Sequence, residues 1–238
     1  MTALLRTEGL TKHFRGLVAN DRIDFTLQPG EVRSIIGPNG AGKTTFLSMI
    51  SGHAPPTSGR IWYRDRDITD LSVVSRARIG IGRKFQTPTL FEALSAYENV
   101  ELAVLRTDCP PGEREARVDS VLGTVRLTEN RLTPAQFLSH GQRQWLEIAL
   151  LLASNAELLL LDEPTAGMTV EETAATAELI NRLARERKLS IIIIEHDINF
   201  IRDLAARVTV LHLGRVLTEG SFDEVAADQR VREVYLGS

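Results

Sequence analysis

The 238-residue chain is long enough for one large α/β domain or two small ones, and its apolar content of 43% is ample for a core. Its formal net charge of −3 gives no electrostatic argument for binding nucleic acid or an anionic membrane surface. The single cysteine excludes an internal disulfide, and because no segment resembles a membrane span or a signal peptide, we expect a cytoplasmic protein.

The first third of the chain predicts antiparallel strands followed by a buried one. Residues 4–10 and 18–27 alternate apolar and polar side chains, as half-buried antiparallel strands do. Residues 32–36 form an apolar run typical of a buried strand, and after a glycine-rich stretch a helix is expected from Thr45 to about Ser51. The remaining elements expected in this part are a strand at 60–63, a short helix at 69–78 and a strand at 79–85.

The middle of the chain changes to helical periodicity. Such a block inside an α/β chain predicts an inserted helical subdomain at about 93–154, between core segments 1–92 and 155–238 of one domain. The helices expected within it cover residues 95–106, 113–124 and 140–153.

The last third alternates strands and helices, which favours a mainly parallel sheet with helices on both faces. The run 191–194 is apolar throughout, as a central parallel strand should be. The expected elements are strands at 157–161, 189–194, 208–213 and 216–219, and helices at 170–186, 197–206, 221–227 and 228–236.

One stretch has the composition of a phosphate-binding loop. It lies between a predicted strand and a predicted helix, the context that such a loop requires. Its glycines allow positive φ and close approach of a ligand, Lys43 brings a charge to the β/γ-phosphates, and Thr44 offers a hydroxyl to Mg²⁺. An ordinary tight turn is the alternative, and the flanking elements argue against it. The stretch reads Gly37-Pro38-Asn39-Gly40-Ala41-Gly42-Lys43-Thr44, followed by Thr45.

Acidic and imidazole groups follow two other buried strands. In parallel sheets, ligands bind beyond the carboxyl ends of the strands. Four leucines end at Asp162 and Glu163, so Asp162 is placed to hold Mg²⁺ and Glu163 to orient or deprotonate a water. His196 follows the isoleucine strand and can contact a γ-phosphate or that water. The alternatives are a solvated acidic pair and a simple helix start.

Two further stretches carry polar groups. Gln86 ends a predicted strand, so its amide can reach the metal or the water. Leu138-Ser139-His140-Gly141-Gln142 opens the last inserted helix, with Ser139 as a plausible N-cap and Gly141 leaving the backbone there unobstructed. A helix N-terminus with a free hydroxyl is a second anion site, although an ordinary capped helix explains the same residues.

Together these motifs resemble those of ATP-binding cassette (ABC) ATPases over essentially the whole chain. They are, in order, the Walker A loop 37–44, the glutamine loop at Gln86, the signature 138–142, the Walker B end at Asp162 and Glu163, and the histidine loop at His196. The resemblance implies an α/β P-loop NTPase (RecA-like) core, with an N-terminal antiparallel β subdomain and an inserted α-helical subdomain.

The resemblance also implies roles for these residues. Each ATP would lie between the Walker A loop of one subunit and the signature of a second, which is a copy or a paralogue. Phe14 sits where the family places the aromatic that stacks on adenine, although a core aromatic is an alternative. Glu163 would be the general base and His196 the γ-phosphate switch. Three side chains would surround Mg²⁺: Thr44, Gln86 and Asp162.

The subfamily is indicated by less specific stretches. The loop 165–169 and the ending 231–237 look like the branched-chain amino-acid importer branch, whereas 82–88 and 138–148 look like the D subunit of urea importers. His140 replaces the usual third glycine of the signature, and Thr169 stands where an aspartate is common, which puts the usual aspartate contact across the dimer in doubt.

The resemblance to importers implies partners. Two permease subunits would bind near Gln86, a periplasmic or extracellular solute-binding protein would deliver the solute, and the chain would sit on the inner face of the cell membrane. Two alternatives remain: a lipid-extracting ABC ATPase, which shares the phenylalanine at position 14, and a nucleic-acid-linked one. The charge balance and the short spacing from Walker A to the signature argue against the latter.

Overall fold

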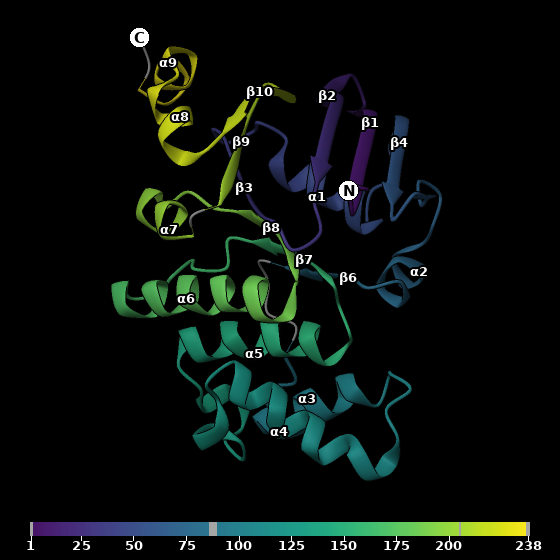
Figure 1. The fold of residues 1–238 in the computed structure, drawn as a ribbon, viewed down its shortest axis with the longest axis vertical. Coiled ribbons are helices and arrows are strands. Elements are labelled where there is room, and N and C mark those ends of the chain that lie inside the picture. Colours follow the sequence, from purple (N-terminus) through teal and green to yellow (C-terminus); the bar gives the residue numbers. More distant parts are fainter. Residues whose placement is uncertain (1, 86–89, 205, 237–238) are drawn as a thin grey trace.

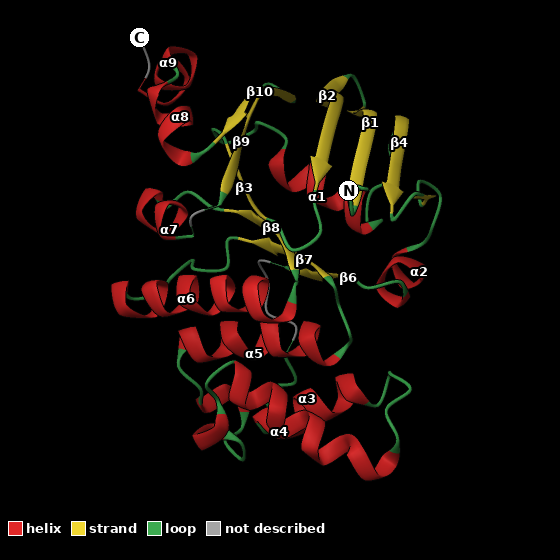
Figure 2. Cartoon of the chain, in the orientation of Figure 1, coloured by secondary structure: helices red, strands yellow, loops and turns green. Residues whose placement is uncertain are grey.

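The computed structural model describes residues 2–85, 90–204 and 206–236, which build two sheets flanked by helices (Figures 1 and 2). The smaller sheet is antiparallel and has the strand order β2-β1-β4-β5. It confirms the strands predicted at the N-terminus and adds a two-residue strand that the sequence did not reveal. Its strands are β1 (Leu5–Phe14), β2 (Leu17–Leu27), β4 (Ser58–Tyr63) and β5 (Arg66–Asp67).

The larger sheet carries the motifs and has the order β10-β9-β3-β8-β7-β6. Neighbouring strands from β9 to β6 run parallel, and β10 pairs antiparallel with β9. The carboxyl ends of β3, β7 and β8 therefore meet at one edge, as the sequence predicted. The strands are β3 (Val32–Ile36), β6 (Ile81–Lys84), β7 (Leu158–Asp162), β8 (Ser190–Ile194), β9 (Arg207–His212) and β10 (Arg215–Gly220).

The central strands are buried on both faces. Every residue of β7 and β8 is buried, which is why these segments read as continuous apolar runs rather than alternating ones. Leu159 and Ile193 pack into one cluster with the helices on one side, and Leu160 and Ile192 pack into another with the helix that follows β3. A strand held from both sides fixes the polar residues at its end.

Three helices pack together beyond the larger sheet: α3 (Ala96–Val104), α4 (Arg114–Thr124) and α5 (His140–Ala153). Figure 1 shows α5 between the sheet and the other two. Their bounds agree with the predicted helices to within two residues at each end. The division into core and helical subdomain remains a prediction.

The remaining helices differ from prediction mainly at their ends. The helix expected from residue 69 begins at Val73, because Ser72 is its N-cap and accepts a hydrogen bond from the Ser75 N–H. The helix expected to reach residue 206 ends at Asp203. Within the described ranges, no helix has the length and apolarity needed to cross a membrane. The helices are α1 (Lys43–Ser51), α2 (Val73–Arg78), α6 (Val170–Arg187), α7 (Ile198–Asp203), α8 (Phe222–Ala227) and α9 (Gln229–Leu236).

Candidate functional site

The glycine-rich loop joins the carboxyl end of β3 to the N-terminus of α1. Lys43 folds back across it, and its Nζ donates to the Gly37 carbonyl at 2.7 Å and to the Pro38 carbonyl at 3.0 Å. Burial lowers the pKa of Lys43, although Glu163 and Asp162 oppose that effect. Gly42 is the N-cap of α1 and has no side chain to satisfy the first-turn N–H groups, which leaves these donors for an anion.

Two glycines of the loop lie close to the backbone of neighbouring strands. A Cβ on Gly37 would lie 2.1 Å from the Leu211 carbonyl oxygen, and one on Gly42 would lie 2.3 Å from that of Ala19. Gly40 also has positive φ, but a Cβ there would meet no atom within 4 Å. The loop therefore packs closely against β9 of the larger sheet at Gly37 and against β2 of the smaller sheet at Gly42, and it is open at Gly40.

We expect Gly42→Ala to destabilise the protein more than Gly40→Ala does. Both substitutions carry the cost of positive φ, about 1–2 kcal/mol. Only Gly42→Ala also forces a methyl into backbone, which adds about 1–3 kcal/mol. Denaturant unfolding without nucleotide measures both losses, with Gly40→Ala as the matched control. Equal losses would contradict the close approach at Gly42.

Asp162 ends β7 and is almost completely buried, at 1% exposure. Arg83, from the neighbouring β6, places its Nη2 3.3 Å from Asp162 Oδ2 and donates through Nη1 to Ser48 and Ser51 of α1. Burial raises the pKa of Asp162, against the smaller opposing effect of Arg83. Arg83 thus holds the Oδ2 oxygen of Asp162 in place.

The other oxygen of Asp162 fits a hard cation. Oδ1 is buried and has no hydrogen-bond partner among the described residues. The Thr44 side chain is close enough to Asp162 to lower the pKa of its carboxyl slightly. A carboxylate and a hydroxyl oxygen are donors that Mg²⁺ accepts. Gln86, the third predicted ligand and a predicted catalytic residue, lies outside the described residues.

Glu163 and His196 meet at the same edge. The His196 Nε2 lies 3.3 Å from Glu163 Oε1, and both side chains are partly exposed. Glu163 has a φ of 48°, and its N–H donates to the Ile194 carbonyl of β8, so strand pairing sets its orientation. The structure thus brings the predicted base and the predicted γ-phosphate contact together.

The signature stretch forms the N-terminus of α5, with Ser139 as its N-cap. The prediction of a free hydroxyl is wrong, because Ser139 Oγ accepts from the Gln142 N–H and donates to Glu172 Oε1, both at 3.1 Å. The prediction that Gly141 lies unobstructed is also wrong, because a Cβ there would lie 2.5 Å from the Glu172 carboxyl. His140 Nε2 is 2.7 Å from the Ala166 carbonyl oxygen.

The signature and the phosphate loop do not bond to each other directly in the part of the chain that the structure describes. Among the described residues, no hydrogen bond or ion pair joins Ser139, His140, Gly141 or Gln142 to residues 37–45.

Phe14 ends β1 and remains 47% exposed, so the alternative of a core aromatic is wrong. The Lys12 Nζ lies 5.0 Å from its ring centroid. An exposed ring on a hairpin is a surface on which a base can stack.

We expect Phe14→Ala to weaken ATP binding by about 1–3 kcal/mol, the usual range for a base stacked on an aromatic ring. Leu17→Ala is the matched control, because Leu17 is the exposed cross-strand partner of Phe14. Isothermal titration measures the change, and binding of inorganic tripolyphosphate, which has no base, should stay the same. A loss of tripolyphosphate affinity would argue against stacking.

Sequence reasoning missed two residues that support the site. Asn20 of β2 donates from Nδ2 to the Gly42 carbonyl, and nothing in its alternating strand marks it. Glu195 is buried and accepts from the N–H and the hydroxyl of Thr165, which fixes the loop after β7. Its place beside His196 at the end of a buried strand was the available signal.

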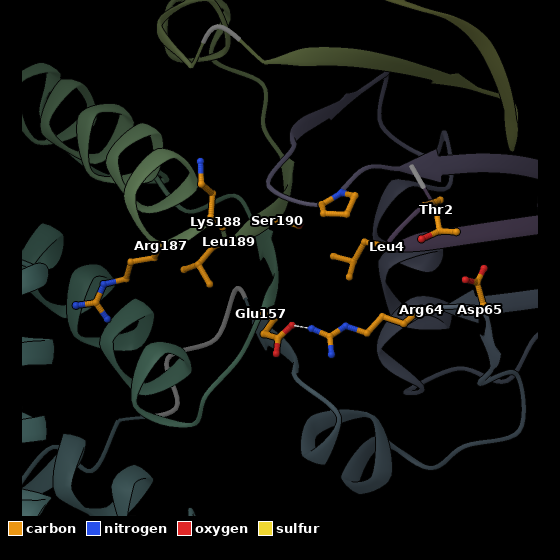
Figure 3. A pocket seen from close by; sticks show the side chains of 11 residues that line it. Thr2, Leu4, Arg64, Asp65, Glu157, Arg187, Lys188, Leu189 and Ser190 are labelled. Carbon is orange, nitrogen blue, oxygen red and sulfur yellow. Dashed lines mark hydrogen bonds and ion pairs between the residues drawn. The ribbon is translucent and has the colours of Figure 1, made fainter.

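Figure 3 shows a pocket of about 400 Å³ at the opposite ends of the strands. Glu157 precedes β7 there, Ser190 begins β8, and Arg64 pairs with Glu157. None of the predicted site residues lines it. This pocket is therefore separate from the predicted nucleotide site at the carboxyl ends of the strands.

Comparison with known proteins identifies relatives of this chain. A family model described as ABC transporter matches residues 20–166, and one described as Branched-chain amino acid ATP-binding cassette transporter matches residues 215–238. The lipopolysaccharide export system ATP-binding protein LptB of Acidithiobacillus ferridurans is 40% identical, over 100% of this chain and 98% of that protein. The high-affinity branched-chain amino acid transport ATP-binding protein LivG of Escherichia coli (strain K12) is 33% identical, over 98% of each.

Solved structures agree with the fold. The ADP conformation of an ATP-binding cassette of an ABC transporter superposes with a TM-score of 0.89 at 27% identity, over 100% of both chains. A dimeric bacterial ABC transporter cassette gives a TM-score of 0.81 at 29% identity, over 92% of this chain and 98% of that one. The predicted fold class is confirmed.

Proposed function

This chain belongs to the ABC transporter family and hydrolyses ATP, and from that premise we propose that it powers the import of a small solute. The match of residues 215–238 to the branched-chain amino-acid cassettes carries the proposal, and the similarity to LivG supports it. Urea, a related small amide or a branched-chain amino acid is the proposed solute. The stretches 82–88 and 138–148, which resemble the D subunit of urea importers, favour urea.

We assign the chemistry to residues at the carboxyl ends of the strands. The loop N–H groups and Lys43 bind the phosphates, while Thr44 and Asp162, together with Gln86, would hold Mg²⁺. Bound Mg²⁺ would neutralise charge that develops on the phosphates. Glu163 accepts the proton of the attacking water, and His196, 3.3 Å from Glu163, contacts the γ-phosphate.

The proposed active unit is a head-to-tail dimer. The signature residues Ser139, His140, Gly141 and Gln142 would meet ATP held by the loop of a second subunit, a copy or a paralogue. The likeness to a dimeric cassette supports this arrangement. ATP binding would close the dimer, and hydrolysis would reopen it.

The proposed membrane partners are two permease subunits that dock near Gln86, with a solute-binding protein in the full complex. The chain would then sit on the inner face of the cell membrane. This placement rests on family membership.

Solute uptake by cells that lack the gene tests the proposal. We expect uptake of radiolabelled urea or leucine to be lost, and to return with the wild-type gene but not with Glu163→Gln. Unchanged uptake of urea, small amides and branched-chain amino acids would overturn import of this solute class.

Lipid export is the second candidate, favoured by the 40% identity to LptB over the whole chain. The same deletion strain distinguishes it: normal solute uptake with lipopolysaccharide retained in the inner membrane would favour export. A nucleic-acid-linked role has no such support, because the net charge is −3.

A further inference from the structure

The carboxylate of Glu172 lies on the N-terminus of the signature helix. Glu172 belongs to the first turn of α6, yet its Oε1 accepts the Ser139 hydroxyl of α5 at 3.1 Å. Its carboxyl also lies against Gly141, where any Cβ would come within 2.5 Å of it. The helix end that the proposed function assigns to the partner's ATP is thus already in contact with an anion.

The two oxygens of this carboxylate have different partners. Oε2 accepts from the Thr169 N–H at 3.1 Å and completes the capping box of α6. Oε1 is not needed for that cap and reaches across to Ser139. The contact with the signature is therefore separable from the folding of α6.

Ser139 cannot serve Glu172 and a phosphate at the same time. Its hydroxyl has one proton, which it donates to Glu172, and its oxygen accepts from the Gln142 N–H. A γ-phosphate bound by this hydroxyl would bring a second negative charge within a few Å of the carboxylate. Helix N-termini favour anions, but two like charges at one terminus repel each other.

We propose that Glu172 is a positioning residue that holds the Ser139 hydroxyl in the absence of a partner and competes with the γ-phosphate of the partner's ATP for it. The inference rests on the shared ATP site of the proposed function. Closure of the dimer then requires Ser139 to exchange one anion for another, so Glu172 sets the ATP concentration at which the subunits pair.

ATP-dependent dimerisation of the Glu163→Gln protein, followed by light scattering, tests the competition. Adding Glu172→Gln keeps the capping box, since glutamine also serves there, but removes the charge. We expect the ATP concentration at half-dimerisation to fall about three- to thirtyfold, with a weaker salt dependence. The matched control is Glu171→Gln, an exposed charge in the same turn. An unchanged midpoint, or an equal shift in the control, would overturn the proposal.

A second measurement does not need a dimer. In a Cys109→Ser background, Ser139→Cys places a thiol beside Glu172, whose charge should raise the pKa of that thiol and slow its alkylation by iodoacetamide. Adding Glu172→Gln should speed alkylation several-fold, and equal rates would overturn the proposal. Failure of the Glu163→Gln protein to dimerise with ATP would instead count against the homodimeric site of the proposed function. The alkylation rates would still show whether the Glu172 carboxylate acts on the side chain at position 139.

Discussion

Glu163→Gln is expected to retain ATP binding and to lose about 10²–10⁴-fold in the rate of hydrolysis, the usual scale for a lost general base. The carboxylate lies at the edge where the phosphate loop and Asp162 also meet, and its Oε1 is 3.3 Å from His196 Nε2. Glutamine keeps the size and the backbone contact to Ile194 but cannot accept a proton. Steady-state phosphate release measures the rate, and a nucleotide titration measures the binding.

The control for this variant is Glu186→Gln, an exposed glutamate on α6. It changes the net charge equally and should leave turnover unaltered. If Glu163→Gln turned over within a few-fold of the wild-type rate, Glu163 would not be the general base. In that case His196 would be the next residue to test, since its Nε2 lies 3.3 Å from Glu163 Oε1.

Lys43→Ala is expected to weaken ATP binding by at least about tenfold, because a hydrogen bond to a charged group contributes about 1.5–3 kcal/mol. Two effects combine here. The cation that faces the phosphates is lost, and the carbonyls of Gly37 and Pro38 lose the donor that shapes the loop. Fluorescence titration with a labelled nucleotide measures the affinity.

Unfolding without nucleotide separates binding from folding in this variant. If Lys43→Ala unfolds at nearly the wild-type denaturant concentration, its loss of ATP affinity comes from the missing contact between Lys43 and the phosphates and not from a destabilised fold. Lys43→Arg is the matched substitution, because it retains the charge but not the geometry of the ammonium group. Wild-type affinity in Lys43→Ala would contradict the phosphate-loop assignment.

The sequence predicted the central elements well because local and tertiary preferences agree there. β7 and β8 are apolar throughout because both faces are covered, and α5 begins where Ser139 caps it. The start of α2 was missed because several cap-forming residues precede it. Thr69 instead donates its N–H to Asp67 in a turn, which leaves Ser72 to begin the helix.

The site was predicted in part. Strand topology alone brings Glu163 and His196 to one edge, so their proximity could be foreseen. The Arg83 contact to Asp162 depends on a side-chain direction across two strands, and the Glu172 contact joins helices far apart in sequence. Neither leaves a local pattern. Reading Gly141 as open space failed because a glycine also marks where another group packs closely.

The exposure of Phe14 has a consequence for nucleotide choice. A half-exposed ring on a hairpin offers a flat face, and every base has a π-face that can stack on it. Discrimination between adenine and guanine requires hydrogen bonds to the edge of the base, and Phe14 is the one predicted site residue that would touch the base. We therefore expect GTP to be hydrolysed nearly as well as ATP by the purified protein. The preference for ATP would then come from its abundance in the cell and not from the binding surface.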